Sequence, residues 1–212
     1  FIRASISEVE KTVLVAFALV VFIIFFFLRN WRVTLIPAIV IPISLVGIFF
    51  VMFLAGFSIN VLSMLALVLA VGLVVDDAIV VAENIYQKVE RGMDPVEASI
   101  VGSKEIFFAV VSTTITLVAI FFPIVFLEGM TGRLFREFSI VISGAVIIST
   151  FVALSFVPML SSKMLKSGRK KSKYYVKTEV MFDGMNRFYK NTLVSFLFKK
   201  WLVFSVVILS GI

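Results

Sequence analysis

Long apolar runs separated by short polar segments dominate the pattern of the chain. The runs cover residues 12–28, 33–57, 61–86, 106–127 and 138–160, and the third of them carries the few charges that fall inside a run. A helix of about 20 apolar residues crosses the roughly 30 Å hydrocarbon core of a bilayer. The pattern therefore predicts an all-α fold, a polytopic membrane helical bundle with five complete spans.

The pattern changes after the fifth run. Residues 161–177 are rich in Lys and Arg, and residues 179–198 alternate apolar and polar positions at helical spacing, which predicts an amphipathic helix lying in the membrane interface. Residues 201–212 are apolar but too short to cross a bilayer, so they predict the start of a partial sixth span. The expected organisation is a lead-in over residues 1–11, a bundle over 12–160, a basic loop with an interfacial helix over 161–200, and this last element.

Several residues predict where helices begin, bend or end. Asn60 is placed to cap the helix that starts at Val61, and Asp94 followed by Pro95 is typical of a helix start. Pro37 and Pro42 predict a kinked second span. The charged segment 83–105 is expected to be a polar loop that contains one short surface helix.

Two adjacent carboxylates, Asp76 and Asp77, lie inside the third apolar run. An Asp at the centre of a membrane-spanning helix costs about 2.5–3.5 kcal/mol on insertion scales, so the pair needs a polar groove, a partner or a proton. A shorter span that ends at a solvated Asp pair is the plainer alternative, but the apolar run resumes over 78–82. Gly72, one turn before Asp76, and the small residues Ser63, Ala66, Ala70, Ala78 and Ala82 predict close helix packing around the pair.

Composition supports a membrane setting and restricts the chemistry. The chain is 61% apolar, contains 24 Phe and has a mean hydropathy of +1.13. It contains no Cys and no His, so disulfides, thiolate or imidazole metal sites and histidine acid–base chemistry are excluded. We expect no metal, no cofactor and no enzymatic activity, and the proton is the ligand that the paired carboxylates imply. The first residues do not resemble a signal peptide, so we expect the chain to be a segment of a larger protein.

Hydroxyl residues in the fourth and fifth runs leave two interpretations open. Ser112, Thr113, Thr114 and Thr116 either line a hydrated groove or bond back to carbonyls of their own helix. In the fifth run Ser139, Ser143 and Thr150 fall near one helical face.

The distribution of Lys and Arg predicts the orientation of the bundle. When alternate connections are assigned to opposite sides, sixteen basic residues fall on one side and four on the other, eleven of the sixteen between Lys163 and Lys200. The richer side is expected to be cytoplasmic. The basic run over 161–177 has aromatic residues only at Tyr174 and Tyr175 and not interleaved along its length, so it indicates contact with anionic lipid and not with nucleic acid.

The carboxylate pair allows two other functional interpretations. An intramembrane aspartyl protease needs two Asp from different helices, whereas Asp76 and Asp77 are neighbours and the spans contain no third Asp. A non-transporting bundle with an assembly or sensing role is the remaining alternative.

The sequence around the pair resembles a known family of transporters. The stretch VLAVGLVVDDAIVVAENIY, preceded by PAIVIPISLVG and GFSIN and followed by FFPIVFLEGMTGRLFREFSI, is similar to the second to sixth transmembrane helices of the resistance-nodulation-division efflux pumps. Residues 201–212 resemble the start of the seventh helix of those pumps. At this place the Asp-Asp sequence resembles that of the branch that exports hydrophobic and amphiphilic drugs, whereas the metal-exporting branch typically carries Asp-Ala-Ala.

The resemblance implies a function for the pair and a set of partners. In that family the two Asp bind and release the protons that drive export, which implies this role for Asp76 and Asp77. The resemblance also implies a bacterial inner-membrane location, a homotrimer, a periplasmic adaptor and an outer-membrane channel. A second transmembrane half with a Lys that pairs with the Asp, and periplasmic domains with the drug pockets, would complete the pump, and none of these maps onto a residue of this chain.

Overall fold

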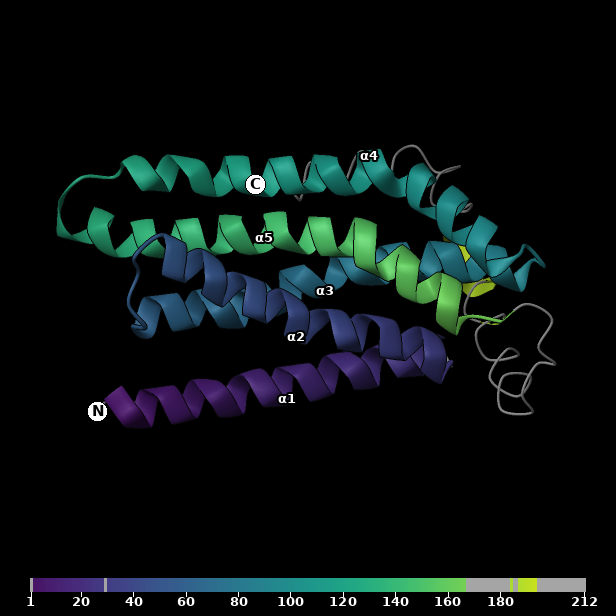
Figure 1. Cartoon of the computed structure of the whole chain (residues 1–212), viewed down its shortest axis with the longest axis horizontal. Helices are drawn as coiled ribbons and strands as arrows, with labels where there is room; N and C mark the ends of the chain where they lie inside the picture. Colours follow the sequence, from purple (N-terminus) through teal and green to yellow (C-terminus); the bar gives the residue numbers. More distant parts are fainter. Residues whose placement is uncertain (1, 29, 167–183, 185–186, 194–212) are drawn as a thin grey trace. The chain divides into compact units, whose positions relative to one another are not determined.

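The computed structural model describes residues 2–28, 30–166, 184 and 187–193, and the chain divides into two units, Phe1–Gly168 and Arg169–Ile212. The first unit contains five α-helices and one short 3₁₀ helix: α1 (Ile2–Leu28), α2 (Trp31–Leu54), α3 (Val61–Glu90), α4 (Pro95–Phe121), η1 (Phe122–Phe126) and α5 (Gly129–Met164) (Figure 1). Five helical segments are long and apolar enough to cross a membrane. The predicted all-α polytopic bundle with five spans is confirmed.

The second unit can be compared with the sequence only in part. Residues 184 and 187–193 are helical, and 187–193 are exposed. Most of the predicted interfacial helix over 179–198 and all of the predicted partial span over 201–212 lie outside the described residues.

Helix α3 is the centre of the first unit. It contacts all four other helices, whereas α1 contacts only α2 and α3 among the described elements. Half of the membrane-spanning window of α3 is buried, against 6% of that of α1. The most extensive packing joins α3 to α5, which also contacts α4 and α2 (Figure 1). The carboxylates of α3 are therefore carried by the best-supported helix of the bundle.

Small residues allow this packing. Ser63, Ala66, Ala70, Ala78 and Ala82 are all completely buried, which confirms their predicted role in close helix contact. One apolar cluster contains Ala66, Ala70 and Val74 of α3, and another contains Ala78, Ala82 and Ile85. Asp77 lies in the sequence between these two clusters, so its level in the bundle is a polar layer between two apolar ones.

The helix ends follow the predicted capping chemistry. The Asn60 side chain accepts hydrogen bonds from the backbone N–H of Leu62 and of Ser63, and the Ser63 hydroxyl accepts one from the N–H of Asn60, so a reciprocal capping box starts α3. The Asp94 carboxylate accepts from the N–H of Val96 at the start of α4, with Pro95 in the first turn. Both predicted N-caps are confirmed.

Two predicted boundaries are wrong. Helix α4 runs without interruption from Pro95 into the fourth span, so there is no separate short surface helix in the polar segment. Residues 129–137, which separate the fourth and fifth apolar runs in the sequence, form the beginning of α5 and not a loop, because the left-handed Gly129 (φ +83°) reverses the chain and the residues that follow it tolerate helix. Helix α1 begins at Ile2, and its candidate membrane-spanning segment, Lys11–Leu28, agrees with the predicted first span.

Candidate functional site

Asp76 and Asp77 occupy different environments although they are neighbours on α3. Asp76 is exposed, whereas Asp77 is half-buried and faces α5. Successive helical residues differ in direction by about 100°, so adjacent side chains cannot share one face. The pair therefore combines one carboxylate that no described helix covers with one that is held inside the bundle.

Two hydroxyl groups of α5 contact Asp77. The Thr150 hydroxyl donates to Asp77 Oδ2 at 3.1 Å, and the Ser149 Oγ lies 3.4 Å from the same oxygen. Ser149 is closer to the backbone carbonyl of Val74, to which its hydroxyl donates at 2.9 Å. Ser149 thus ties α5 to the backbone of α3 one turn before Asp77, and Thr150 provides the stronger contact with the carboxylate.

Thr150 in turn contacts a second hydroxyl group. The Thr114 Oγ1 of α4 forms a hydrogen bond with the Thr150 Oγ1, and both side chains are buried. Asp77 is in this way connected to two neighbouring helices, directly to α5 and through one hydroxyl to α4.

Asp76 lies on a row of exposed residues along α3, here called the open stripe. Its members are spaced three or four residues apart, so they share one helical face. The open stripe consists of Val61, Leu65, Leu69, Gly72, Asp76, Val80, Glu83 and Gln87.

The open stripe corrects the prediction for Gly72. A Cβ added at Gly72 would meet no atom within 4 Å, so among the described residues this glycine packs against no neighbouring helix. The reason is its direction: Gly72 lies one turn before Asp76 on the uncovered face, whereas Ala70 and Ala78 point into the bundle. Because Gly72 has no side chain, open space remains beside Asp76 on this face of α3.

The pair has no ionised partner in the described part of the chain. No salt bridge or hydrogen bond to Asp76 is present there, and no group of three or more potential ligand residues could hold a metal ion. The segments 33–54, 106–126 and 138–162, which pack around α3, contain no ionisable residue. The carboxylates of the pair therefore have no compensating charge within the described bundle.

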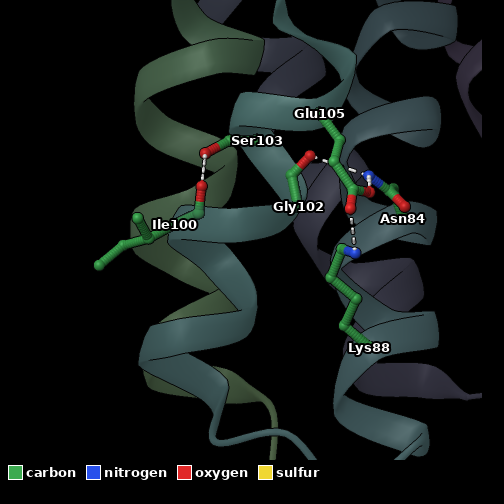
Figure 2. A network of polar contacts seen from close by, with 6 residues as sticks. All are labelled: Asn84, Lys88, Ile100, Gly102, Ser103 and Glu105. Atoms are coloured by element: carbon green, nitrogen blue, oxygen red, sulfur yellow. Dashed lines mark hydrogen bonds and ion pairs between the residues drawn. The ribbon is translucent and has the colours of Figure 1, made fainter.

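A polar network joins α3 to α4 two turns beyond the pair. The Asn84 amide donates to the carbonyl of Gly102 at 2.8 Å, and the Lys88 ammonium pairs with the Glu105 carboxylate at 2.7 Å (Figure 2). Glu105 is largely exposed, so the ion pair is screened by solvent. The network fixes the separation of the two helices at this end of the bundle.

Comparison with known proteins assigns the family. The sequence profile described as the AcrB/AcrD/AcrF family matches residues 1–212, the whole chain. The chain belongs to this family. The match confirms the resemblance to the resistance-nodulation-division pumps that the residues around Asp76 and Asp77 carry.

Curated relatives of this family member are multidrug resistance proteins. The chain is 49% identical over 171 residues to the multidrug resistance protein MdtC of Pectobacterium atrosepticum. The aligned residues cover 81% of this chain and 17% of the relative. It is 50% identical over 168 residues to MdtC of Klebsiella pneumoniae and 48% identical over 168 residues to MdtC of Escherichia coli O139:H28, covering 79% of this chain and 16% of the relative in each case. The chain thus spans about a sixth of the length of these relatives.

Sequence reasoning about this AcrB-type chain missed the hydroxyl partners of Asp77. Thr150 was recognised only as one of three hydroxyls on a face of the fifth run, and Thr114 only as part of a hydroxyl cluster. Thr113, Thr114 and Thr116 do bond back to carbonyls of their own helix, which confirms that interpretation of the cluster. Adjacent hydroxyls at 149 and 150 in an otherwise apolar run were the available signal, because a buried hydroxyl needs a partner.

Proposed function

We propose that this chain is the proton-coupling transmembrane part of an inner-membrane antiporter that exports hydrophobic or amphiphilic compounds. The observation that carries the proposal is the environment of the carboxylate pair. Asp76 and Asp77 are the only ionisable side chains between residues 61 and 82 of the central helix, and one faces the open stripe while the other is bound by hydroxyls.

The physical mechanism is proton uptake by two carboxylates that cannot both remain charged without cost. Two negative charges on adjacent residues in a low-dielectric interior repel each other, so binding of a proton relieves both the repulsion and the desolvation of the charge. A proton that crosses a potential of about 100 mV carries roughly 2.3 kcal/mol, enough to bias a two-state equilibrium. Coupling requires that the protonated and ionised pairs favour different conformations of the bundle.

The remaining parts of the function belong to a full-length protein that contains this chain. The relatives are named multidrug resistance proteins, and this chain covers about a sixth of their length. We place the substrate pockets, the homotrimer contacts, the periplasmic adaptor and the outer-membrane channel outside the residues described here. The open stripe leaves Asp76 accessible to a cationic partner from a second transmembrane half.

The test is proton flux in the full-length protein reconstituted in liposomes with an imposed pH gradient and a fluorescent substrate. Asp76→Asn and Asp77→Asn are each expected to abolish substrate-stimulated proton flux. Glu97→Gln is the matched control, because Glu97 is an exposed carboxylate in the first turn of α4. Unchanged flux in either Asp variant would overturn the proposal, and absence of flux in the parent protein would favour the assembly or sensing alternative.

A second measurement separates this chain from the whole transporter. The 212-residue chain alone, in the same liposomes, is expected to insert as helices but to show no substrate-stimulated proton flux. A static carboxylate pair without a competing cation has no reason to release its proton on the opposite side. Flux that depends on Asp77 in the chain alone would contradict this division of roles.

A further inference from the structure

The hydroxyl pair formed by Thr114 and Thr150 has more hydrogen-bond acceptors within reach than it has protons. The Thr150 Oγ1 lies 3.1 Å from Asp77 Oδ2 and 3.0 Å from the carbonyl oxygen of Val146. The Thr114 Oγ1 contacts the Thr150 Oγ1 and lies 2.8 Å from the carbonyl oxygen of Val110. Each hydroxyl carries one proton, so each can donate to only one of these acceptors at a time.

The acceptor to which each hydroxyl donates depends on the protonation state of Asp77. When the carboxylate is ionised, Thr150 donates to Asp77 and Thr114 donates to Thr150, which polarises the Thr150 hydroxyl and strengthens its bond to the charge. When the carboxyl group carries a proton, its O–H donates to the Thr150 oxygen. The Thr150 hydroxyl then donates to Val146 and the Thr114 hydroxyl to Val110.

Both arrangements give Asp77 and each of the two threonine hydroxyls a hydrogen-bond partner. Thr114 and Thr150 are buried, so a lost hydrogen bond there would not be replaced by water. The carbonyls of Val110 and Val146 lie one helical turn before the two threonines, within their own helices, and are available in either state. No hydroxyl proton leaves its oxygen in this change; both hydroxyl groups only rotate.

The charged surroundings of Asp77 are simple. Asp76 is its charged neighbour on α3, and α4 and α5 contribute no ionisable residue over 106–121 and 138–162. Helices α1 and α2 contribute none over 12–28 and 33–54. The hydroxyl pair is therefore the main polar group that responds to the charge of Asp77 inside the described bundle.

We propose that Thr150 and Thr114 are positioning residues that hold Asp77 in both of its protonation states by reorienting a shared pair of hydroxyl groups. The proposal rests on the proposed proton coupling, because it assigns the pair to the same carboxylate. It goes beyond that function by linking α4, which does not contact Asp77 directly, to the loading of the site. Asp77 protonation is accompanied by a change in hydrogen bonding on two neighbouring helices.

The experiment is infrared difference spectroscopy of the full-length protein between an acid and an alkaline pH. The carbonyl-stretch band of protonated Asp77 is assigned as the band that Asp77→Asn removes. Thr150→Val is expected to move this band to higher frequency, because the protonated carboxyl loses its hydrogen-bond partner. Thr114→Val is expected to leave this band near the parent frequency, because Thr114 donates to Val110 when Asp77 is protonated. It is expected to shift the carboxylate-stretch band of ionised Asp77, because Thr150 then loses the hydroxyl that polarises it.

Two variants separate this role from a purely structural one. Thr150→Ser keeps the hydroxyl and is expected to keep the band at the parent frequency. Thr116→Val is the matched control on α4, because the exposed Thr116 bonds only to the Ser112 carbonyl of its own helix among the described residues. It is expected to leave the carboxyl and carboxylate bands unchanged. An unmoved carboxyl band in Thr150→Val, or equal shifts of the carboxylate band in Thr114→Val and Thr116→Val, would overturn the proposal.

Transport supplies an independent readout. A hydrogen bond to a charged acceptor changes an equilibrium by about tenfold or more, so Thr150→Val is expected to reduce proton-coupled export about tenfold, and Thr150→Ser to restore it within about twofold. The two proposals fail in distinguishable ways. Normal flux in Asp77→Asn would refute proton coupling, whereas a parent-like infrared band in Thr150→Val would refute the hydroxyl pair whatever the flux.

Discussion

Gly102 is the residue whose replacement tests the packing of α3 against α4 most directly. A Cβ at Gly102 would lie 2.9 Å from Ile85 Cγ1 and 3.2 Å from Ile85 Cα, and Ile85 is completely buried. The second of these atoms belongs to the backbone, so a side-chain rotation cannot relieve the contact. Gly102→Ala must therefore push the two helices apart by a few tenths of an ångström.

The magnitude follows from two opposing effects. Adding a methyl group to a packed interface costs about 1–3 kcal/mol of unfolding free energy, while Gly→Ala inside a helix gains up to about 1 kcal/mol. Gly72→Ala isolates the second effect, because it makes the same change in α3 where a Cβ meets nothing within 4 Å. Gly72→Ala is expected to be neutral or stabilising, and Gly102→Ala to be about 1–3 kcal/mol less stable than Gly72→Ala.

The assay is reversible unfolding of the 212-residue chain in mixed detergent micelles, with the parent, both single variants and a double-mutant cycle. Ile85→Ala removes the Cγ1 that the new methyl group would meet, so the penalty of Gly102→Ala should shrink in that background. Equal changes in unfolding free energy for Gly102→Ala and Gly72→Ala would refute the reasoning. So would a penalty that Ile85→Ala leaves untouched.

Three further predictions concern capping, orientation and the surface ion pair. Asn60→Ala is expected to lower the unfolding free energy by about 1 kcal/mol or more, measured in the same micelles, because it removes the side-chain cap of α3. When a single Cys replaces either Ser58 or Glu97, both of which are exposed, an impermeant maleimide should label the Ser58 variant and not the Glu97 variant in intact cells. The reverse result would invert the predicted orientation. Lys88→Ala should cost less than about 1 kcal/mol, and added salt should reduce that cost, because Glu105 is largely exposed; a larger, salt-independent loss would contradict this.

Much of the bundle could be predicted from residue order alone because its determinants are local. Five apolar runs of span length require helices in a bilayer, where backbone groups have no other partner. Asn60 and Asp94 mark helix starts through hydrogen bonds to residues two or three positions away. The continuation of α4 from Pro95 into the fourth span and the start of α5 at Gly129 differ from the prediction, because charged residues suggest a loop although nothing in them breaks a helix.

The candidate site likewise combines features that depend on single positions with features that depend on tertiary packing. The amino-acid sequence by itself determined that two ionisable residues, Asp76 and Asp77, lie within a membrane-spanning helix, since charge and hydropathy are properties of single positions. Only the tertiary structure decided which of them is covered, because burial depends on which neighbours pack on each face of α3. It likewise brought Thr150, 73 residues from Asp77, to one carboxylate oxygen, and Thr114, 37 residues from Asp77, to the hydroxyl of Thr150. This juxtaposition arises from the packing of α4 and α5 and has no counterpart in local spacing.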